Sequence, residues 1–479
     1  MSIVLLYDNL FLFLGNFIIV INRSCKGLLV THDSLNGLYE KKTHNSKKAY
    51  DNSVNIFPGG ISHNIRFFKP YPFFVNKAKD KHLFDVDGNK FVDYWMGHWA
   101  LVLGHSPTIV VKKLARQIHK GTLYGTANDI SVDLGETIKK SIPTSELLRF
   151  CTTGSEATMY AIRIARAVTK KRFICKSIGG WHGFNTDLMQ SVNYPFEIDE
   201  GVGMTGREGD FVESIPYNDL DRSIKLLDSV KDDLACVILE PILGGGGCIP
   251  ADINYLRGLE EYCKRNGILF VLDEIVTGFR FNFGSYSSVY HLDPDMITLG
   301  KIVGGGLPIG VLCGKKEIMK VANPVENMNK EQICYIGGGT FSSNPLTMTA
   351  GYATLDYLRQ NRKTIYNKIN KLGEMARNGL RKLFSDYGLK TQVTGIGSLF
   401  LTHFLTDKVN EITNANDVAL SDIQGLMRYH FVLMAKHGIF FLPRKMGAIS
   451  TVHDVKDINN LLNATEKIIK SDIFLKVKT

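Results

Sequence analysis

Two charged residues stand at the ends of two apolar runs near the middle of the chain. Lys301 follows the run Met296–Gly300 and precedes a glycine loop, and Asp273 follows the run Gly267–Leu272. Both runs have the length of buried strands, and the carboxyl ends of parallel strands open onto the ligand crevice of an open sheet. A desolvated lysine beside an acid suits pyridoxal phosphate, because the lysine can form a Schiff base while the acid holds the pyridinium proton. Taken alone, Lys301 also fits a solvated loop entry.

A third segment supplies a candidate phosphate site. Arg149–Thr152 has the pattern of a short strand, and the turn Thr153–Glu156 opens a stretch whose apolar residues keep helical spacing. The first turn of a helix has free N–H groups and the positive end of the helix dipole, which together attract phosphate. An N-capped helix without a ligand fits the same pattern, so this segment leaves both interpretations open.

Apolar strand-like runs alternate with helical stretches over the rest of the chain, as a doubly wound sheet requires. The strand candidates are Phe173–Cys175, Cys236–Leu239, Ile268–Leu272, Met296–Leu299 and Ile309–Cys313, with later ones at Gly397–Phe400 and Gly438–Phe441. Helices are predicted over Asn254–Asn266 and from Pro345 to Asn361.

Six motifs follow one another along the chain: Cys151–Ala157, Trp181–Gly183, Glu240–Pro241, Asp273–Arg280, Thr298–Lys301 and Gly339–Pro345. Their order and spacing resemble the class-III aminotransferase pattern, and within that class the glutamate-1-semialdehyde 2,1-aminomutases. The early segments Pro58–Ile61 and Leu83–Asn89 share this likeness, which runs from about residue 53 to about residue 463. The resemblance implies an α/β protein of fold type I, in which a large domain has a mostly parallel sheet flanked by helices. A smaller α+β domain is expected at the C-terminus.

The resemblance also implies the catalytic roles. Lys301 would bind pyridoxal 5'-phosphate covalently and then move the proton between the substrate carbon and the cofactor carbon. Asp273 would keep the ring nitrogen protonated, so that the ring can accept electrons. Gly154 and Ser155 would hold the phosphate through backbone and hydroxyl donors.

The remaining cofactor contacts follow from the same resemblance. Trp181 would stack on one face of the ring and Val276 would cover the other, although ordinary core positions are the alternative for both. Thr340 would reach the phosphate of a neighbouring subunit, which implies a homodimer with shared active sites. The complete predicted cofactor-binding set is Gly154, Ser155, Trp181, His182, Glu240, Asp273, Val276, Lys301 and Thr340.

Substrate choice depends on positions at which the chain departs from the aminomutase pattern. Arg66 falls where the family binds the substrate carboxylate, and Arg444 adds a second candidate; a surface arginine is the alternative for each. Glycine stands at 245 and 447 where asparagine and glutamate are expected, and Phe184–Ile215 replaces the usual gating loop. A mutase must retain its intermediate and a transaminase must release its first product, so both activities stay open. The mutase would give 5-aminolevulinate for tetrapyrrole biosynthesis; the transaminase would exchange amino groups between an amino acid or omega-amino compound and a 2-oxo acid.

Composition agrees with a cytoplasmic enzyme that acts on a small amino or oxo acid. The 479 residues exceed the usual size of a single core, and the net charge of +10 is dispersed instead of forming a nucleic-acid motif. The eight cysteines include no C-x-x-C pair and no metal-like spacing with histidine, which favours reduced thiols and no bound metal. A ligand-sensing regulator with this fold would need a DNA-binding unit in front, and only about fifty residues precede the match.

The start of the chain is the least regular part. Residues from Ile3 to Ile21 are strongly apolar and approach the length of a membrane span, but Asp8, Asn9 and Asn16 interrupt them and no basic region precedes them. A misplaced start, a peripheral anchor or an extra packing segment fits, and membrane contact is expected only for the anchor. Lys41–Asn55 has a linker-like composition. The predicted divisions are 1–52, an extension and linker; 53–95, a segment packing with the small domain; 96–345, the cofactor-binding large domain; and 346–479, the small domain.

Overall fold

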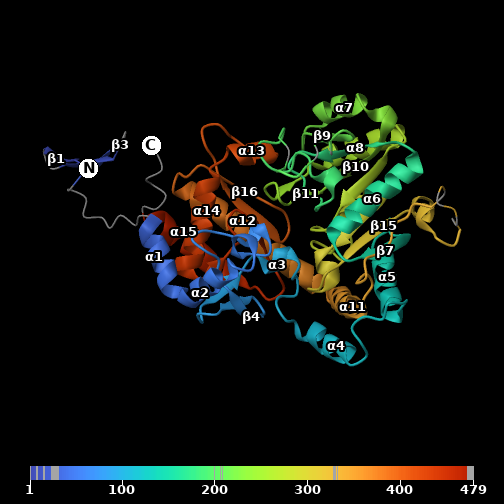
Figure 1. The fold of residues 1–479 in the computed structure, drawn as a ribbon, viewed down its shortest axis with the longest axis horizontal. Coiled ribbons are helices and arrows are strands. Elements are labelled where there is room, and N and C mark those ends of the chain that lie inside the picture. Colours follow the sequence, from blue (N-terminus) through green and yellow to red (C-terminus); the bar gives the residue numbers. More distant parts are fainter. Residues whose placement is uncertain are drawn as a thin grey trace.

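The computed structural model describes residues 2–6, 9–14, 17–22, 32–198, 200–204, 206–207, 209–326, 329, 331 and 333–471. Figure 1 shows a large unit, coloured green to yellow, beside a smaller unit formed by the red C-terminal part and the blue N-terminal helices. The long helix α11 (Pro345–Gln360) follows the large unit in the chain and leads into the smaller one.

A seven-stranded sheet is the centre of the large unit. Its order is β7-β15-β14-β13-β10-β8-β9, and every neighbouring pair is parallel except the two that include β15. The mostly parallel sheet predicted from the sequence is therefore confirmed. The strands are β7 (Leu147–Cys151), β8 (Phe173–Ser177), β9 (Val212–Ile215), β10 (Leu234–Leu239), β13 (Leu269–Asp273), β14 (Met296–Gly300) and β15 (Gly310–Gly314).

Helices cover both faces of this sheet, so alternate residues of one strand belong to two different cores. Cys236 and Ile238 of β10 pack in the core that contains α6 (Gly154–Thr169), while Val237 and Leu239 pack in the core that contains α8 (Ile253–Arg265). Burial on both faces explains why these strands are continuous apolar runs. The short edge strand β9 was not predicted, because its two middle residues are polar and it lies within the segment taken as a replaced loop.

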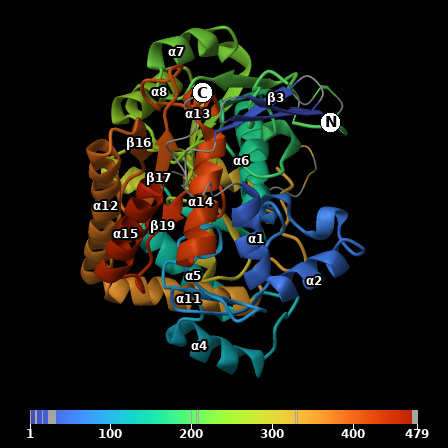
Figure 2. The same ribbon diagram turned by 90° about the vertical axis from the view of Figure 1, so that its left-hand side faces the viewer.

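Two small sheets form the core of the smaller unit. One has the order β16-β17-β19, and the other has the order β18-β6-β5-β4, in which β18 from late in the chain pairs in parallel with β6 from its start. Helices α12, α15, α14 and α1 lie next to one another along this unit (Figure 2). The bounds are β4 (Val75–Lys79), β5 (His82–Asp85), β6 (Lys90–Asp93), β16 (Thr391–Thr394), β17 (Leu399–Phe404), β18 (Ile439–Phe440), β19 (Gly447–Ala448), α12 (Arg362–Asp386), α14 (Ile423–His437) and α15 (Val455–Lys470).

The remaining elements connect these units or lie at their surfaces. They are β11 (Ile242–Leu243), β12 (Ile249–Pro250), α3 (Met96–Trp99), α4 (Thr108–Ile118), α5 (Asp129–Ser141), α7 (Leu220–Asp228), α9 (Tyr286–Tyr290), α10 (Lys316–Met319) and α13 (Ala415–Leu420), with short 3₁₀ turns at η1 (Pro58–Gly60), η2 (Asn64–Arg66), η3 (Thr186–Leu188), η4 (Lys231–Asp233), η5 (Lys301–Gly304) and η6 (Lys320–Ala322).

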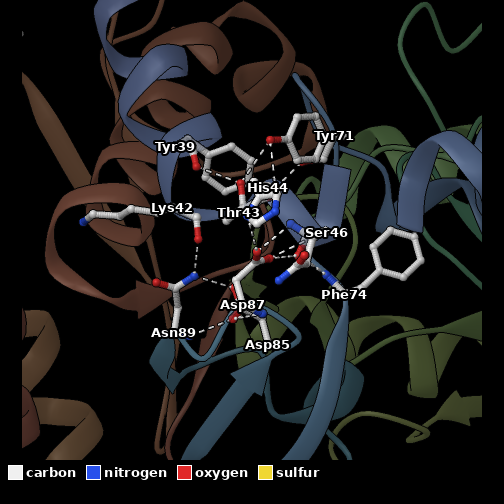
Figure 3. A network of polar contacts seen from close by, with 11 residues as sticks. Tyr39, Lys42, Thr43, His44, Ser46, Tyr71, Phe74, Asp85, Asp87 and Asn89 are labelled. Carbon is white, nitrogen blue, oxygen red and sulfur yellow. Dashed lines mark hydrogen bonds and ion pairs between the residues drawn. The ribbon is translucent and has the colours of Figure 1, made fainter. Parts of the chain in front are cut away.

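The prediction that Lys41–Asn55 is a linker is wrong, because most of this segment is helical. Helices α1 (His32–Lys42) and α2 (His44–Ser53) are joined by one residue and pack on the smaller unit. The side chain of Thr43, the N-cap residue of α2, makes no capping bond. The helix is capped instead by Asp87 from a distant turn, whose carboxylate accepts hydrogen bonds from two backbone N–H groups of its first turn (Figure 3). Local composition could not reveal a cap supplied from forty residues away.

The apolar start of the chain forms strands. β1 (Ser2–Leu6), β2 (Asn9–Leu14) and β3 (Phe17–Asn22) pair in sequence order as an antiparallel sheet. Among the described residues, no helix has both the length and the apolar character needed to cross a membrane. The expectation of a peripheral anchor stays a prediction, as do the domain boundaries given above.

Candidate active site

Lys301 lies where β14 ends. It is the first residue of η5 and has a φ of 49°, so its side chain leaves the strand at a sharp turn. The amine stands 5.7 Å from the centre of the Trp99 ring. Burial lowers the pKa of Lys301, against the opposing charges of Asp273 and Glu240. A lowered pKa favours the neutral amine, which is the nucleophilic form.

Asp273 ends the neighbouring strand β13, and both of its carboxylate oxygens have partners. Oδ1 accepts hydrogen bonds from the hydroxyl of Thr298 (3.0 Å) and from the backbone N–H of Ile275 (3.1 Å). Oδ2 lies 2.7 Å from Nδ1 of His182. Thr298 stands opposite Asp273 in the parallel register of β13 and β14. Sequence reasoning missed Thr298, although it lies three residues before the lysine in a quoted motif.

His182 fixes the other side of this acid. Its side chain is fully buried, and desolvation lowers its pKa more than Asp273 raises it. The ring is therefore neutral, with Nδ1–H donating to Asp273. Its carbonyl accepts a hydrogen bond from the hydroxyl of Thr158 (2.7 Å), which anchors the histidine to α6. Nε2 has no hydrogen-bond partner within the part of the chain that the structure describes.

The candidate phosphate site has the predicted strand–turn–helix form. Thr153 and Glu156 make a capping box, in which the Glu156 carboxylate accepts N–H bonds from residues 152 and 153. Gly154 and Ser155 occupy the first turn, where the helix itself supplies no acceptors. The Ser155 hydroxyl accepts from the N–H of residue 184, 3.0 Å away. Gly183 has a φ of +85°, and a Cβ there would lie 2.2 Å from the Ser155 hydroxyl, so only glycine fits.

Three further predicted residues lie around this centre. The buried carboxyl of Glu240 accepts N–H bonds from Trp181 (3.0 Å) and Gly244 (3.2 Å). Burial, with a smaller effect of Asp273, raises the pKa of Glu240 to about 8. Val276 is buried, and a Cβ placed on Gly244 would touch both Val276 and the Glu240 carboxylate. The Trp181 ring meets the Phe184 ring edge-on, with 5.0 Å between the ring centres.

A left-handed turn that the sequence did not reveal forms the opposite wall. All four residues of α3 have positive φ, between 46° and 67°, and only one of them is glycine. Such a run is strained for L-residues, and it persists where surrounding contacts determine it. Asp93 accepts N–H bonds from residues 95 and 96, and the buried guanidinium of Arg280 donates to the Trp99 carbonyl. The turn presents Trp99 to Lys301 and stacks His98 against His63, with ring centres 5.4 Å apart.

The two predicted substrate arginines are both exposed. Arg66 ends η2, close enough to lower the pKa of His98 through its charge. Arg444 lies between β18 and β19 with a φ of 59°. The next residue, Lys445, is much more enclosed, and burial lowers its pKa to about 8. From the sequence, Arg444 and Lys445 together add positive charge that could bind another carboxylate or face solvent.

Thr340 is exposed in the loop before α11. A Cβ on its neighbour Gly339 would lie 3.5 Å from a Glu156 carboxylate oxygen, so this loop runs beside the start of α6 in the same chain. Tyr160 of α6 donates a hydrogen bond to the carbonyl of Gly337. The approach of Thr340 to the phosphate of a second subunit stays a prediction.

Two departures from the aminomutase pattern have opposite structural consequences. A Cβ on Gly447 would lie 2.5 Å from the Phe441 ring and 2.9 Å from the Phe400 ring, so no larger side chain fits there. A Cβ on Gly245 would have one neighbour, the Cβ of Trp181 at 3.5 Å, which is an ordinary contact. Glycine at 245 therefore leaves room beside Trp181.

The third departure is the segment Phe184–Ile215, which is hydrogen-bonded to strand β8. Lys176 of β8 is fully buried, and its amine donates a hydrogen bond to the carbonyl of Gln190 at 2.5 Å. Burial lowers the pKa of Lys176 to about 8. Glu200 accepts N–H bonds from residues 192 and 193 within the same segment. These contacts hold the described residues around Gln190 to β8 and those around Glu200 to one another.

A lysine and a paired acid at adjacent strand ends, with a helix N-terminus beside them, define a fold-type-I pyridoxal-phosphate enzyme. The aminotransferase class-III family model matches residues 66–451. A protein of Methanosphaera stadtmanae named glutamate-1-semialdehyde 2,1-aminomutase is 36% identical over 428 residues, which cover 89% of this chain and 98% of that protein. One of the same name from Methanocaldococcus jannaschii is 34% identical, covering 90% and 99%. The chain belongs to the class-III aminotransferase family and is a pyridoxal-phosphate-dependent enzyme.

Solved structures agree with this fold. An omega-transaminase from Sphaerobacter thermophilus has a TM-score of 0.83 and 27% identity, covering 89% of this chain and 97% of that one. A glutamate-1-semialdehyde aminomutase from Pseudomonas aeruginosa has a TM-score of 0.82, covering 92% and 97%, but its 20% identity shows the fold alone. Structural likeness therefore does not separate mutase from transaminase.

Proposed function

We propose that this enzyme is an aminomutase that converts glutamate 1-semialdehyde into 5-aminolevulinate, the reaction that feeds tetrapyrrole biosynthesis. The observation that carries the proposal is the paired acid Asp273 beside Lys301 on adjacent strand ends, in a chain whose relatives of that name match over nearly their whole length. The reaction moves an amino group within one substrate, so it consumes no external donor.

The residues around Lys301 fit pyridoxal phosphate. The bound cofactor supplies an electron-accepting ring that stabilises negative charge on a substrate carbon. Asp273, with both oxygens hydrogen-bonded in place, holds the proton on the ring nitrogen. The first-turn N–H groups at Gly154 and Ser155 bind the phosphate.

Lys301 then performs two tasks with one amine. It would hold the cofactor covalently, and once released its neutral form would take a proton from the substrate and return it at another carbon. Burial supports both tasks, because it lowers the pKa of Lys301. Trp181 and Val276 would lie beside the ring and keep water from it, and Arg66 would bind the carboxylate of the substrate.

The working enzyme is proposed to be a cytoplasmic homodimer with shared sites. Large apolar side chains near Thr340 are exposed in the single chain, including Tyr335 at 78% and Phe341 at 59%. All seven cysteines that the structure describes are free thiols, as in a reducing compartment. Mixing Lys301→Ala and Thr340→Ala subunits tests sharing: a hybrid with shared sites regains one intact site, whereas sites confined to one chain regain none.

A transaminase is the second candidate, because the pocket departs from the aminomutase pattern. Gly245 leaves room beside Trp181, and Gly447 has no space for the expected glutamate. The replaced cover Phe184–Ile215 is where a mutase retains its intermediate. These three changes favour a substrate that enters and leaves more freely.

Product analysis separates the two activities. Purified enzyme in the pyridoxamine-phosphate form receives glutamate 1-semialdehyde alone, and 5-aminolevulinate is measured over time. A mutase forms it with no amino acid or 2-oxo acid consumed, and Lys301→Ala forms none. If no 5-aminolevulinate appears while an amino acid and a 2-oxo acid exchange amino groups, the transaminase replaces the mutase.

A further inference from the structure

The fully buried ring of His182 has a hydrogen-bond partner on one nitrogen and none on the other. Nδ1 lies 2.7 Å from Oδ2 of Asp273. Nε2 is buried as well, and it makes no hydrogen bond to any residue that the structure describes. In a neutral ring that carries its proton on Nδ1, Nε2 is an acceptor and needs a donor. An unpaired acceptor in the interior costs stability, so native proteins seldom contain one.

A second unpaired polar atom lies close to Nε2 of His182. Ser177 is the last residue of β8 and is fully buried, and its hydroxyl has no hydrogen-bond partner within the described part of the chain. A Cβ built on Gly180 would lie 2.8 Å from this hydroxyl and 3.1 Å from Nε2 of His182. The two unpaired atoms therefore lie around the same point, beside the residue that pairs with Asp273.

The turn between β8 and His182 brings these atoms together. The N–H of Gly180 donates to the carbonyl of Ser177 at 3.1 Å, and the N–H of Gly179, whose φ is 77°, donates to the carbonyl of Ser191 at 2.7 Å. The Cβ position on Gly180 is also 3.0 Å from the Ser177 carbonyl oxygen, which is a third polar atom around this point. Because residue 180 is glycine, no side chain of its own fills the space between the three polar atoms.

We propose that a bound water joins the hydroxyl of Ser177 to Nε2 of His182, which makes Ser177 a positioning residue for Asp273. The water accepts a hydrogen bond from the Ser177 hydroxyl, and it donates one to Nε2 and one to the Ser177 carbonyl. Three hydrogen bonds are typical of a buried water. Both unpaired side-chain atoms then have a partner.

This chain of hydrogen bonds holds the His182 ring at both nitrogens. With the water in place, the proton stays on Nδ1, from which it is donated to Asp273. Without the water, the ring is held at Nδ1 alone and can tilt away from the carboxylate, which then aligns less well with the ring nitrogen of the bound cofactor. The inference rests on the role proposed for Asp273 in amino transfer, and it holds equally for a mutase and for a transaminase.

Two measurements test the water without using activity. A crystal structure of the cofactor-loaded enzyme should show an ordered water within hydrogen-bond distance of the Ser177 hydroxyl and of His182 Nε2. In enzyme labelled with 15N-histidine, the Nε2 signal of His182, identified by its absence from His182→Asn, should shift in Ser177→Ala, because this nitrogen loses a donor. No such water, a direct bond between the two side chains, or an unshifted signal overturns the inference.

Kinetics with a matched control test the positioning role. Ser177→Ala should lower turnover about three- to tenfold, as for one lost hydrogen bond, and change KM less than about twofold. Ser145→Ala is the control, because it removes another buried serine hydroxyl beside Cys313, which pairs with Ile297 at the opposite end of β14 from Lys301. The control should change neither turnover nor the His182 signal. An equal fall of turnover in both variants overturns the inference.

Asp273→Asn, measured alongside, separates failure of this inference from failure of the proposed function. If Asp273→Asn loses turnover and Ser177→Ala does not, the inference fails and the role of Asp273 stands. If neither variant loses turnover, the proposed role of Asp273 fails as well.

Discussion

The charged side chains on the two sides of the active site differ in whether they have partners within the chain. On one side, the carboxylate of Asp273 has a partner for each oxygen, supplied by His182, Thr298 and a backbone N–H. On the other side, the more enclosed Lys445 has no carboxylate partner within the described ranges of the chain, and Arg66 is exposed. The carboxylate of Asp273 therefore has all its partners within the folded chain, whereas the cations on the other side have no carboxylate partner among the described residues. This difference is the one we expect between a side that holds a permanent cofactor and a side that receives an exchangeable anion.

The contrast also has an energetic meaning. A buried charge with good hydrogen bonds is held in one geometry, which is what proton transfer needs. A buried charge without a partner lowers stability, and such a residue is retained where function requires it. The strain of the left-handed turn at Met96–Trp99 lies on the same side as the unpaired cations.

Removing the amine of Lys301 should have the largest effect. Lys301→Ala loses the covalent attachment and the proton carrier together, so turnover should fall by several orders of magnitude. Steady-state rates with glutamate 1-semialdehyde, or with an amino acid and a 2-oxo acid, measure the loss. The folded state should be retained, because the side chain makes no hydrogen bond that the structure records. Turnover within tenfold of wild type would remove Lys301 from the mechanism.

Replacing the paired acid Asp273 should have the next largest effect, and it tests the side of the site whose charge has partners. Asp273→Asn keeps the shape of the side chain but removes the charge that holds the ring nitrogen protonated, so turnover should fall on the order of a hundredfold. Cofactor absorbance should persist, which separates lost chemistry from lost binding. Thr298→Val, which removes one hydrogen bond to the same carboxylate, should have a smaller effect. Near-normal turnover in Asp273→Asn would refute the role of this charge.

Two glycine substitutions test the shape of the second side. Gly447→Ala should destabilise the protein by roughly 1–3 kcal/mol, since its Cβ would overlap two aromatic rings. Gly245→Ala should change stability by less than about 0.5 kcal/mol, because its Cβ makes only an ordinary contact. Urea unfolding of both variants measures the difference. Equal effects would show that the space beside Trp181 is already filled.

Lys445→Met should stabilise the protein by a smaller amount, on the order of 1 kcal/mol at pH 7. The pKa of Lys445 is lowered from 10.5 to about 8 in the folded chain. Below pH 8 the lysine is charged in both states and the full penalty applies; between 8 and 10.5 the unfolded state holds more protons, so wild-type stability rises relative to the variant. Denaturation at pH 7 and pH 10 measures this decrease in the difference in unfolding free energy between the variant and the wild type. A destabilised variant at pH 7 would mean that Lys445 has an internal partner.

The sequence predicts one side of the site much better than the other. Lys301, Asp273 and the turn at Gly154 follow from apolar runs and the residues that end them, which are local patterns. The contact from Trp99 to Met446 joins residues 347 positions apart, and no local pattern reports it. The cap that Asp87 gives to α2 was missed for the same reason. The left-handed turn at His98 was missed because such residues rarely adopt positive φ.

Covalent labelling tests the central claim most directly. The purified enzyme is reduced with borohydride, which fixes the cofactor to the lysine that holds it, and its peptides are then analysed by mass spectrometry. We expect one pyridoxyl group per chain, on Lys301. A label on Lys176, Lys445 or any other lysine, or no label on a protein that contains pyridoxal phosphate, would contradict it.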